Sequence, residues 1–549
     1  MKVDETEERI ERLSPNGRQT LQSVIKHFGM LPFRDEQLLR HVQPGCSGAE
    51  YRLGLIELEM AGLVKSYRKG WGDKAYMVPR GQFKRCWRMA NPMLHPTVID
   101  ENMVLYSLHG SDEETHLPFG ERLMHGLAEL VNGGLTLTSK GSWPKRTIEK
   151  VVRALAMKEN ELAALKLTAR ESGCPLPFAL FLDIALHEGW LAVEGRECRL
   201  EMNRLLSWMH RTQAQREHAL VSLWAEEYAA AEPALANAAA FVSGWPAYQW
   251  CSPTTGTESD GPFAKAVVDW CRLMTSFGWM EEAEIAGSRT VYRWSVDGSD
   301  HAGDTMDMPR AQIAPDGDVF VPREGPLSAA FGLELIARRV SSDVVGIYRL
   351  EAEPIRKAVE SGISGERIFA FLTQISGEGA PLALVMAIEG WVSEAAGEVR
   401  ETAKSRSFDS LLSDPLPSEH AVYPAPAASA DRPVLLPHDM KEMTELRPSD
   451  PVALFQGIDG VPVTWRNQMR EYHPSTRREL VERALSWRTA VKLNIRGKAV
   501  PFIPDKLLED DEGWRVAGDL SVDGQVERTQ LAPHMWDEMM LVIPEFTKY

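Results

Sequence analysis

The fold of this chain is decided by residues 311–397, which divide into three recognisable pieces. Residues 311–327 read AQIAPDGDVFVPREGPL, residues 344–376 read VVGIYRLEAEPIRKAVESGISGERIFAFLTQIS, and residues 381–397 read PLALVMAIEGWVSEAAG. The short apolar runs VFV and VVGIY are typical of buried strands, whereas the later pieces carry apolar residues at helical spacing. The stretch therefore predicts a strand, a helix and a strand, followed by three helices.

Residues typical of helix starts support this prediction. Pro354 fits a first helical turn, where its missing N–H is not needed, and Ser364 is a candidate cap with Glu366 close behind it. A generic α/β domain would also fit the pattern. One buried helical face is predicted for Ile368, Phe371, Leu372 and Ile375.

The three pieces, in this order, resemble the accessory domain at the N-terminus of XPB-type DNA helicases, which also occurs in bacterial helicase-associated proteins. The resemblance implies a module that serves protein contacts, with a separate helicase or a transcription or repair protein as partner. One departure concerns Pro381, because the family often has a polar residue soon after it and this chain has Leu382 and Ala383.

Length and composition predict several globular domains in an acidic protein. The chain has 549 residues, of which 44% are hydrophobic and 25% charged, and a formal net charge of −17. Phosphate binding depends on Lys and Arg, so nucleic-acid contact is expected only from local basic patches. The charged N-terminus, the lack of a long apolar run and six cysteines without CxxC spacing indicate a cytoplasmic protein without a membrane segment.

The first hundred residues contain such a patch. Helical patterns cover residues 16–28, 34–42 and 47–60. The third ends at Gly62, and two strands follow around a Lys-Gly-Trp-Gly-Asp turn. Three helices and a hairpin predict a winged helix. Eight basic residues and one acid, Asp73, lie between Lys65 and Arg88. A wing on a DNA backbone is the favoured interpretation, and a protein-contact surface is the alternative. The candidate contacts are Lys65, Arg68, Lys69, Trp71 and Lys74.

The junction between helix and wing recurs further along the chain. Apolar helices also end at Gly189 and Gly278, and each is followed by a hairpin pattern, which predicts tandem winged helices. The second unit carries LTLTSKGSWPKRTIEKVVRAL, which resembles a segment of bacterial helicase-associated proteins. A solvated helix face explains this pattern as well as phosphate contact does. Its candidate contacts are Lys140, Lys145 and Arg146.

The last 150 residues predict a linker and a small β-rich domain. Residues 401–450 are rich in Pro, Ala and Ser without periodicity, which is typical of a flexible linker. Beyond them, one amphipathic helix and four short alternating patterns resemble a WYL-type (Sm-like) barrel, although GWRVAG replaces the WYL tripeptide. The pattern is compatible with a domain that binds a ligand and with a domain that packs against a partner. The residues that match are Pro504, Trp514, Gly518 and Leu531, and the basic candidates are Arg477, Arg478, Arg496 and Lys498.

Catalytic motifs are absent from the sequence. The chain has no GxxxxGK[ST] loop to hold nucleotide phosphates, and no HExxH, GxSxG or GxGxxG. Its histidines do not occur at metal-ligand spacing. We therefore expect a non-catalytic protein with no cofactor and no metal.

The sequence as a whole predicts an α+β multidomain protein that is mainly helical. It is expected to bind duplex DNA with weak sequence specificity and to dock a partner protein. A transcriptional regulator with a C-terminal ligand-sensing domain and an interaction scaffold without nucleic-acid binding are the alternatives. The expected parts are winged-helix units at 1–100, 101–235 and 236–310, the XPB-like module at 311–400, the linker at 401–450 and the WYL-like domain at 451–549.

Overall fold

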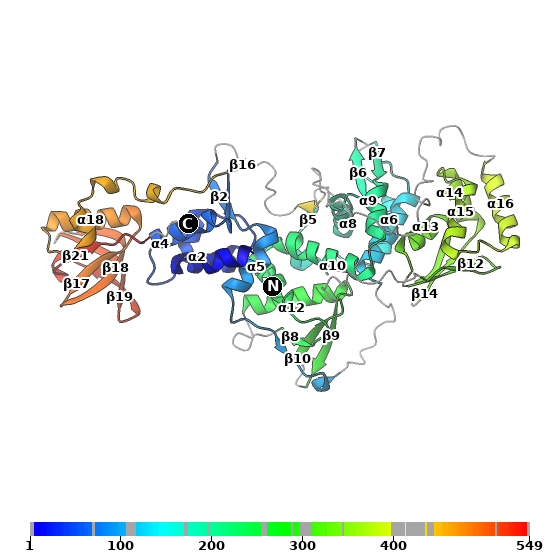
Figure 1. Ribbon diagram of the computed structural model, residues 1–549. Helices are drawn as coiled ribbons and strands as arrows, with labels where there is room; N and C mark the ends of the chain where they lie inside the picture. Colours follow the sequence, from blue (N-terminus) through cyan, green and yellow to red (C-terminus); the bar gives the residue numbers. More distant parts are fainter. Residues whose placement is uncertain are drawn as a thin grey trace.

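The computed structural model confirms an α+β protein in which helices make up half of the chain, with several small antiparallel sheets. In Figure 1 the molecule is elongated, with the C-terminal domain at one end and residues 311–396 at the other. The structure describes residues 5–68, 72–105, 117–139, 141–169, 174–195, 197–253, 261–286, 289–296, 309–323, 325–342, 345–396, 412, 434–435, 444–510 and 513–545.

The N-terminal region consists of helices followed by a hairpin and one more helix. Local signals set these boundaries. Ser14 accepts a hydrogen bond from the backbone of Gly17 at the start of α2, and Ser47 forms a capping box with Glu50 at the start of α4. Gly62 follows α4 with a φ of +70°, a conformation that favours glycine. The elements are α1 (Glu5–Glu11), α2 (Pro15–Phe28), α3 (Asp35–Leu38), a 3₁₀ turn (Leu39–His41), α4 (Gly48–Met60), β1 (Lys65–Arg68), β2 (Lys74–Met77) and α5 (Arg80–Ala90).

The second region is mainly helical and carries the expected hairpin. Strands β6 and β7 pair antiparallel around residues 194–197, directly after a helix that ends beside Gly189. The elements are α6 (Phe119–Asn132), α7 (Lys145–Leu155), a 3₁₀ turn (Ala163–Leu165), β5 (Thr168–Ala169), α8 (Leu176–His187), β6 (Leu191–Glu194), β7 (Glu197–Leu200), α9 (Met202–Met209), α10 (Gln213–Leu223), a π-helix (Trp224–Tyr228) and a 3₁₀ turn (Ala229–Ala231).

The third region also has the expected hairpin, but within a larger sheet. Its order is β3-β8-β10-β9-β4, so strands from residues 97–105 pair with strands from residues 251–294. This sheet therefore joins chain from both sides of the boundary expected near residue 100. The elements are β3 (Thr97–Val98), a 3₁₀ turn (Glu101–Met103), β4 (Val104–Leu105), α11 (Pro233–Val242), β8 (Cys251–Ser252), α12 (Pro262–Ser276), β9 (Met280–Ile285) and β10 (Arg289–Trp294).

The stretch from 311 to 396 has the expected order with two further strands. β11 and β13 flank the two predicted strands in a sheet of order β11-β12-β14-β13. The hydroxyl of Ser364 accepts from the Arg367 amide, and the predicted apolar face of α15 is buried. The elements are β11 (Gln312–Ile313), β12 (Asp318–Pro322), α13 (Leu327–Ile336), β13 (Arg338–Ser342), β14 (Val345–Arg349), α14 (Ala352–Glu360), α15 (Gly365–Ser376) and α16 (Leu382–Ala396).

The C-terminal domain is a five-stranded sheet of order β20-β19-β18-β17-β21 with its own apolar core. Pro504 lies opposite Gly518, where a Cβ atom would come within 2.2 Å of the Ile503 carbonyl oxygen. The domain contacts α4, because the Ala49 amide donates to the Arg488 carbonyl. The elements are 3₁₀ turns (Pro451–Leu454, Ile458–Gly460 and Pro533–Met535), α17 (Val463–Asn467), α18 (Pro474–Trp487), β17 (Val491–Ile495), β18 (Lys498–Asp510), β19 (Gly513–Val522), β20 (Gln525–Leu531) and β21 (Met539–Leu541).

The expected linker contains two short strands, β15 (Val434–Leu435) and β16 (Thr444–Glu445). β15 pairs with β5, and β16 pairs with β1 at the edge of the N-terminal hairpin. These residues of the predicted linker therefore pair with distant strands, since edge strands offer free backbone groups to any segment that reaches them. Most of the rest of residues 401–443 lies outside the described residues.

Candidate nucleic-acid interface

The predicted wing is an antiparallel hairpin in which Lys65 faces Met77 and Arg68 faces Lys74 across the ladder. Two of the predicted contacts, Lys69 and Trp71, lie in the turn outside the described residues. Asp73, the one acid of this basic stretch, forms an ion pair of 2.9 Å with Arg34. The hairpin therefore presents its basic side chains from known register positions on both strands.

Strand β16 lies against this hairpin as a third strand. Glu445 is opposite Tyr67, and the Leu446 amide donates to the Ser66 carbonyl at 2.8 Å. The Lys65 ammonium lies 3.1 Å from the Glu445 carboxylate, and this hydrogen bond raises the pKa of Lys65. An acid from the linker thus neutralises one of the predicted phosphate contacts.

Lys74 is also engaged within the protein. Its ammonium lies 2.8 Å from a Glu59 oxygen and 2.6 Å from the Ser449 hydroxyl, and it sits 4.7 Å from the centre of the Tyr76 ring. The Glu59 side chain is only 2% exposed, so Lys74 compensates a buried carboxylate. Lys74 therefore connects the hairpin to α4 and to the predicted linker.

Arg68 differs from these two lysines. It is exposed at the end of β1, next to the turn, and its side chain forms no ion pair or hydrogen bond among the interactions found in the described part of the chain. An exposed guanidinium carries five donors in a geometry that suits phosphate oxygens. Of the wing residues that the structure describes, Arg68 is the one free to contact a phosphate.

The second predicted patch lies at the start of α7. Lys145 and Arg146 occupy its first turn and are exposed, and neither side chain has a partner among the described residues. The buried side of the helix carries Val151 and Leu155, which turns both basic residues outward. Lys140 lies outside the described residues.

The two patches do not form one continuous site. α7 packs against α6, and Figure 1 places α6 well along the molecule from the hairpin strand β2. A nucleic acid that touches both patches must run along the molecule. The sequence did not reveal the pairing of Lys65 with Glu445, because Glu445 is 380 residues distant from Lys65 along the chain and no local pattern marks it.

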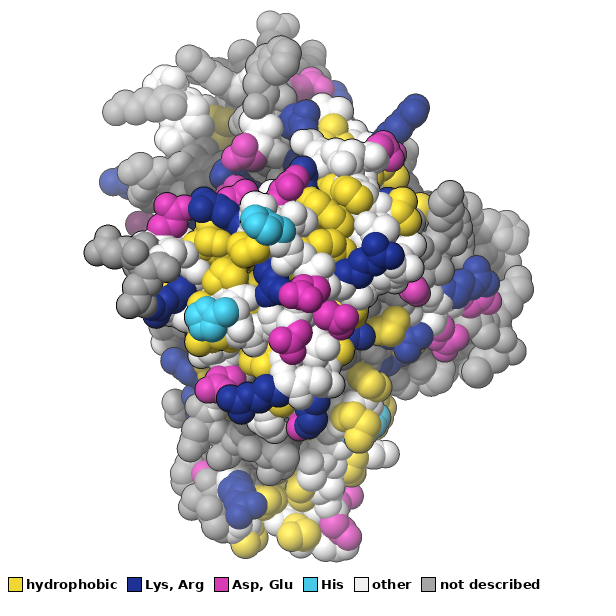
Figure 2. Space-filling view, turned by 90° about the vertical axis from the view of Figure 1, so that its left-hand side faces the viewer, with side chains coloured by type: hydrophobic (Ala, Val, Ile, Leu, Met, Phe, Trp, Pro, Cys, Tyr) yellow, Lys and Arg dark blue, Asp and Glu magenta, His cyan; other side chains and the backbone are white. Residues whose placement is uncertain are grey.

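Among the described residues of the C-terminal domain, two of the predicted basic residues are paired with acids. Figure 2 shows the end of the molecule where this domain lies, with Lys and Arg interspersed among Asp and Glu. Arg478 pairs with Glu482 and Glu509, and Lys498 pairs with Asp523. Ion pairs of this kind leave no single-sign field to attract phosphates.

Within the described part of the chain, no group of three or more His, Cys, Asp or Glu could hold a metal ion. The six cysteines are free thiols, and burial raises the pKa of Cys86 to about 12 and that of Cys198 to about 11. No helix among the described residues is both long and apolar enough to cross a membrane.

Comparison with known proteins does not assign the chain to a family. No family model matches it, and no curated protein does either.

Proposed function

We propose that this protein is a non-catalytic DNA-binding accessory protein that docks a partner protein. The observation that carries the proposal is the contrast within the wing, where Arg68 is exposed and has no partner among the described residues while Lys65 and Lys74 are held by acids. Three helices followed by a hairpin, from α2 to β2, support a winged-helix unit whose wing contacts the DNA backbone. Lys145 and Arg146 on α7 extend the contact.

Weak, sequence-tolerant binding follows from this arrangement. Few free cations on a protein with a net charge of −17 give a modest electrostatic attraction to phosphate. A fluorescently labelled random duplex tests the contact by anisotropy at low salt. We expect Arg68→Glu to weaken binding about tenfold, the equivalent of ~1.4 kcal/mol, whereas Arg356→Glu on α14 leaves it unchanged. Equal affinities for both variants contradict the proposal.

The partner-docking part of the proposal concerns the module from 311 to 396. On α16, Leu384 and Ile388 are buried, while Leu382 is 76% and Met386 is 66% exposed. Exposed apolar side chains on one helix face suit contact with another protein. A pull-down after nuclease treatment tests this, and we expect Leu382→Glu with Met386→Glu to lose a helicase or transcription partner that wild type captures. Retention of that partner by the double variant contradicts the docking role.

A second candidate function, a transcriptional regulator that senses a ligand, is favoured by one observation. A hollow of about 1090 Å³ lies in the C-terminal domain, lined by residues that include Tyr472, His473, Arg477 and Trp514. This candidate predicts a dimer with a clear preference for one DNA sequence, whereas the accessory protein predicts binding that ignores sequence. An ATPase assay at background level agrees with both.

A further inference from the structure

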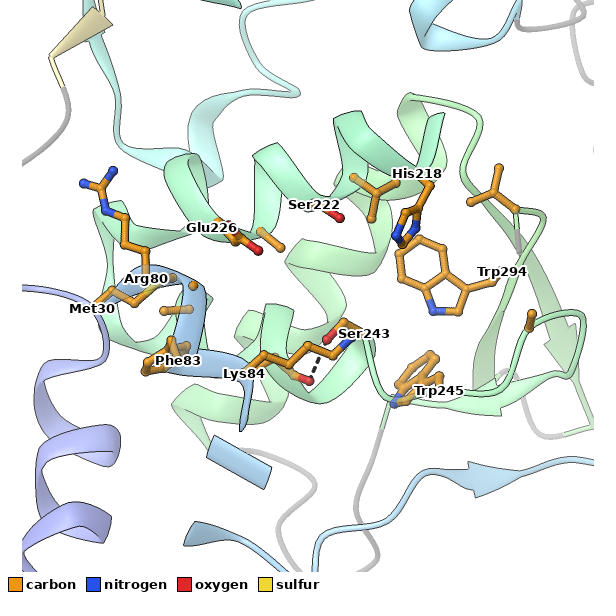
Figure 3. A pocket seen from close by; sticks show the side chains of 17 residues that line it. Met30, Arg80, Phe83, Lys84, His218, Ser222, Glu226, Ser243, Trp245 and Trp294 are labelled. Carbon is orange, nitrogen blue, oxygen red and sulfur yellow. Dashed lines mark hydrogen bonds between the residues drawn. The ribbon is translucent and has the colours of Figure 1, made fainter. Parts of the chain in front are cut away.

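A separate hollow of about 450 Å³ lies where the N-terminal, second and third regions of the chain meet (Figure 3). Its walls come from α5, from α10 and the π-helix that continues it, from α11, and from the end of β10. Its volume falls within the roughly 300–1,000 Å³ of ordinary small-molecule sites. None of the residues of the predicted nucleic-acid interface lines it.

Most of the lining is apolar and has a defined shape. The indoles of Trp245 and Trp294 and the ring of Phe83 are at most 7% exposed and form rigid sides. Small side chains leave the space between them, since Ala236 and Ala240 stand on the α11 side. Aromatic walls around a small-residue floor suit a compact apolar group.

Two charges of opposite sign face the same space. Figure 3 shows Lys84 from α5 and Glu226 from the π-helix extending into it from opposite walls. Burial lowers the pKa of Lys84, as does the charge of Arg88, and burial raises the pKa of Glu226, with the charge of Glu227 adding to it. Both side chains are nevertheless exposed, so they stand where the hollow opens to solvent.

Neither charge is satisfied by the protein. Among the interactions of the described residues, Lys84 and Glu226 form no ion pair with one another and neither has a hydrogen-bond partner. The neighbouring Arg80 is different, because its guanidinium pairs with Glu227. Two exposed charges of opposite sign line the same hollow without an ion pair to each other, so each is available to an occupant that carries both signs.

We infer that this hollow binds a small zwitterion with an apolar side chain, the chemistry of a free apolar amino acid. Its carboxylate pairs with the Lys84 ammonium, its ammonium pairs with the Glu226 carboxylate, and its side chain lies between Trp245, Trp294 and Phe83. The inference is independent of DNA binding, since it uses neither the wing nor α7.

Calorimetry on the full chain tests the inference, with L-phenylalanine, L-leucine and L-tryptophan as probes. We expect at least one to bind saturably with a Kd below about 1 mM. Two further probes each lack one charge, namely 3-phenylpropionate and phenethylamine, and we expect them to bind at least about tenfold more weakly. Absence of binding by all three amino acids, or equal binding of either one-charge probe, overturns the inference.

Variants locate the site. We expect Lys84→Met and Glu226→Gln each to weaken binding about tenfold or more. Each variant leaves one charged group of the bound amino acid without its partner in the protein. Lys357→Met and Glu389→Gln are the matched controls, since these residues lie on α14 and α16 and do not line the hollow. Thermal unfolding of each variant shows that it is folded. Unchanged affinity in both hollow variants overturns the inference.

Discussion

Arg477 is a residue whose sequence context suggested a phosphate contact and whose surroundings give it another role. It is 8% exposed, and its guanidinium donates to the backbone carbonyls of Tyr472, Pro533, Trp536 and Asp537. These bonds tie the start of α18 to the chain between β20 and β21. A charge so fully used inside the domain is not available to nucleic acid.

We predict that Arg477→Met destabilises the C-terminal domain by about 3 kcal/mol, because four carbonyl groups lose a charged donor inside the domain. Urea unfolding followed by tryptophan fluorescence measures the change. Arg478→Met is the control, since Arg478 makes exposed ion pairs with Glu482 and Glu509 and its loss should have little effect. Equal destabilisation by both variants would show that Arg477 is an ordinary surface residue.

A buried charge pair joins α6 to α13. His125 Nδ1 lies 2.9 Å from Glu334 Oε1, and both side chains are largely buried. Burial by itself lowers the pKa of His125, but its contacts with Glu121 and Glu334 outweigh this and raise that pKa above 6.5. Burial opposes the ionisation of Glu334, yet His125 and Arg339 lower its pKa below 4.5.

The signs of these shifts predict how the joint depends on pH. A raised histidine pKa stabilises the folded joint below 6.5, and this contribution disappears as pH rises through the folded pKa. We therefore expect amide exchange in α13, corrected for its intrinsic rate, to quicken as the pH rises above 6.5 and through the raised pKa of His125. His125→Gln should remove that pH dependence. The same dependence in the variant would assign it to another group.

At the scale of elements, the sequence predicts helix boundaries from local signals but does not predict which distant strands pair. Ser14, the Ser47–Glu50 pair and Gly62 act within one turn of the helices that they bound, so the sequence predicts those helices well. Strand β16 has two residues in a segment without alternation, and its partner lies far away along the chain. The pairing of Lys65 with Glu445, which depends on β16, was therefore invisible in the sequence.

We predict that Leu446→Pro strengthens DNA binding about fivefold, because it removes the N–H that donates to Ser66 and so weakens the strand that holds Glu445 on the wing, at a cost of ~1 kcal/mol. Leu446→Ala keeps that N–H and is the matched control. Anisotropy with the random duplex measures both. Weaker binding by the proline variant would mean that β16 supports the wing and does not restrain it.

At the scale of the whole molecule, the α+β class follows from composition and periodicity, whereas the candidate site depends on how distant segments meet. One apolar core runs from the N-terminal helices through the 311–396 module, and the C-terminal sheet has a second core that also takes Ala49 and Leu53 from α4. Contacts of this kind join residues hundreds of positions apart. They decide which of the predicted basic residues remain free.

The central claim is that Arg68, Lys145 and Arg146 contact DNA phosphates, and its most direct test is the salt dependence of duplex binding. Each phosphate contact that is lost lowers the slope of log affinity against log salt by about one. We predict that wild type binds random duplex at low salt and that Arg68→Glu with Lys145→Glu and Arg146→Glu lowers the slope by about three. No binding by wild type at low salt, or the same slope for the triple variant, would contradict the account.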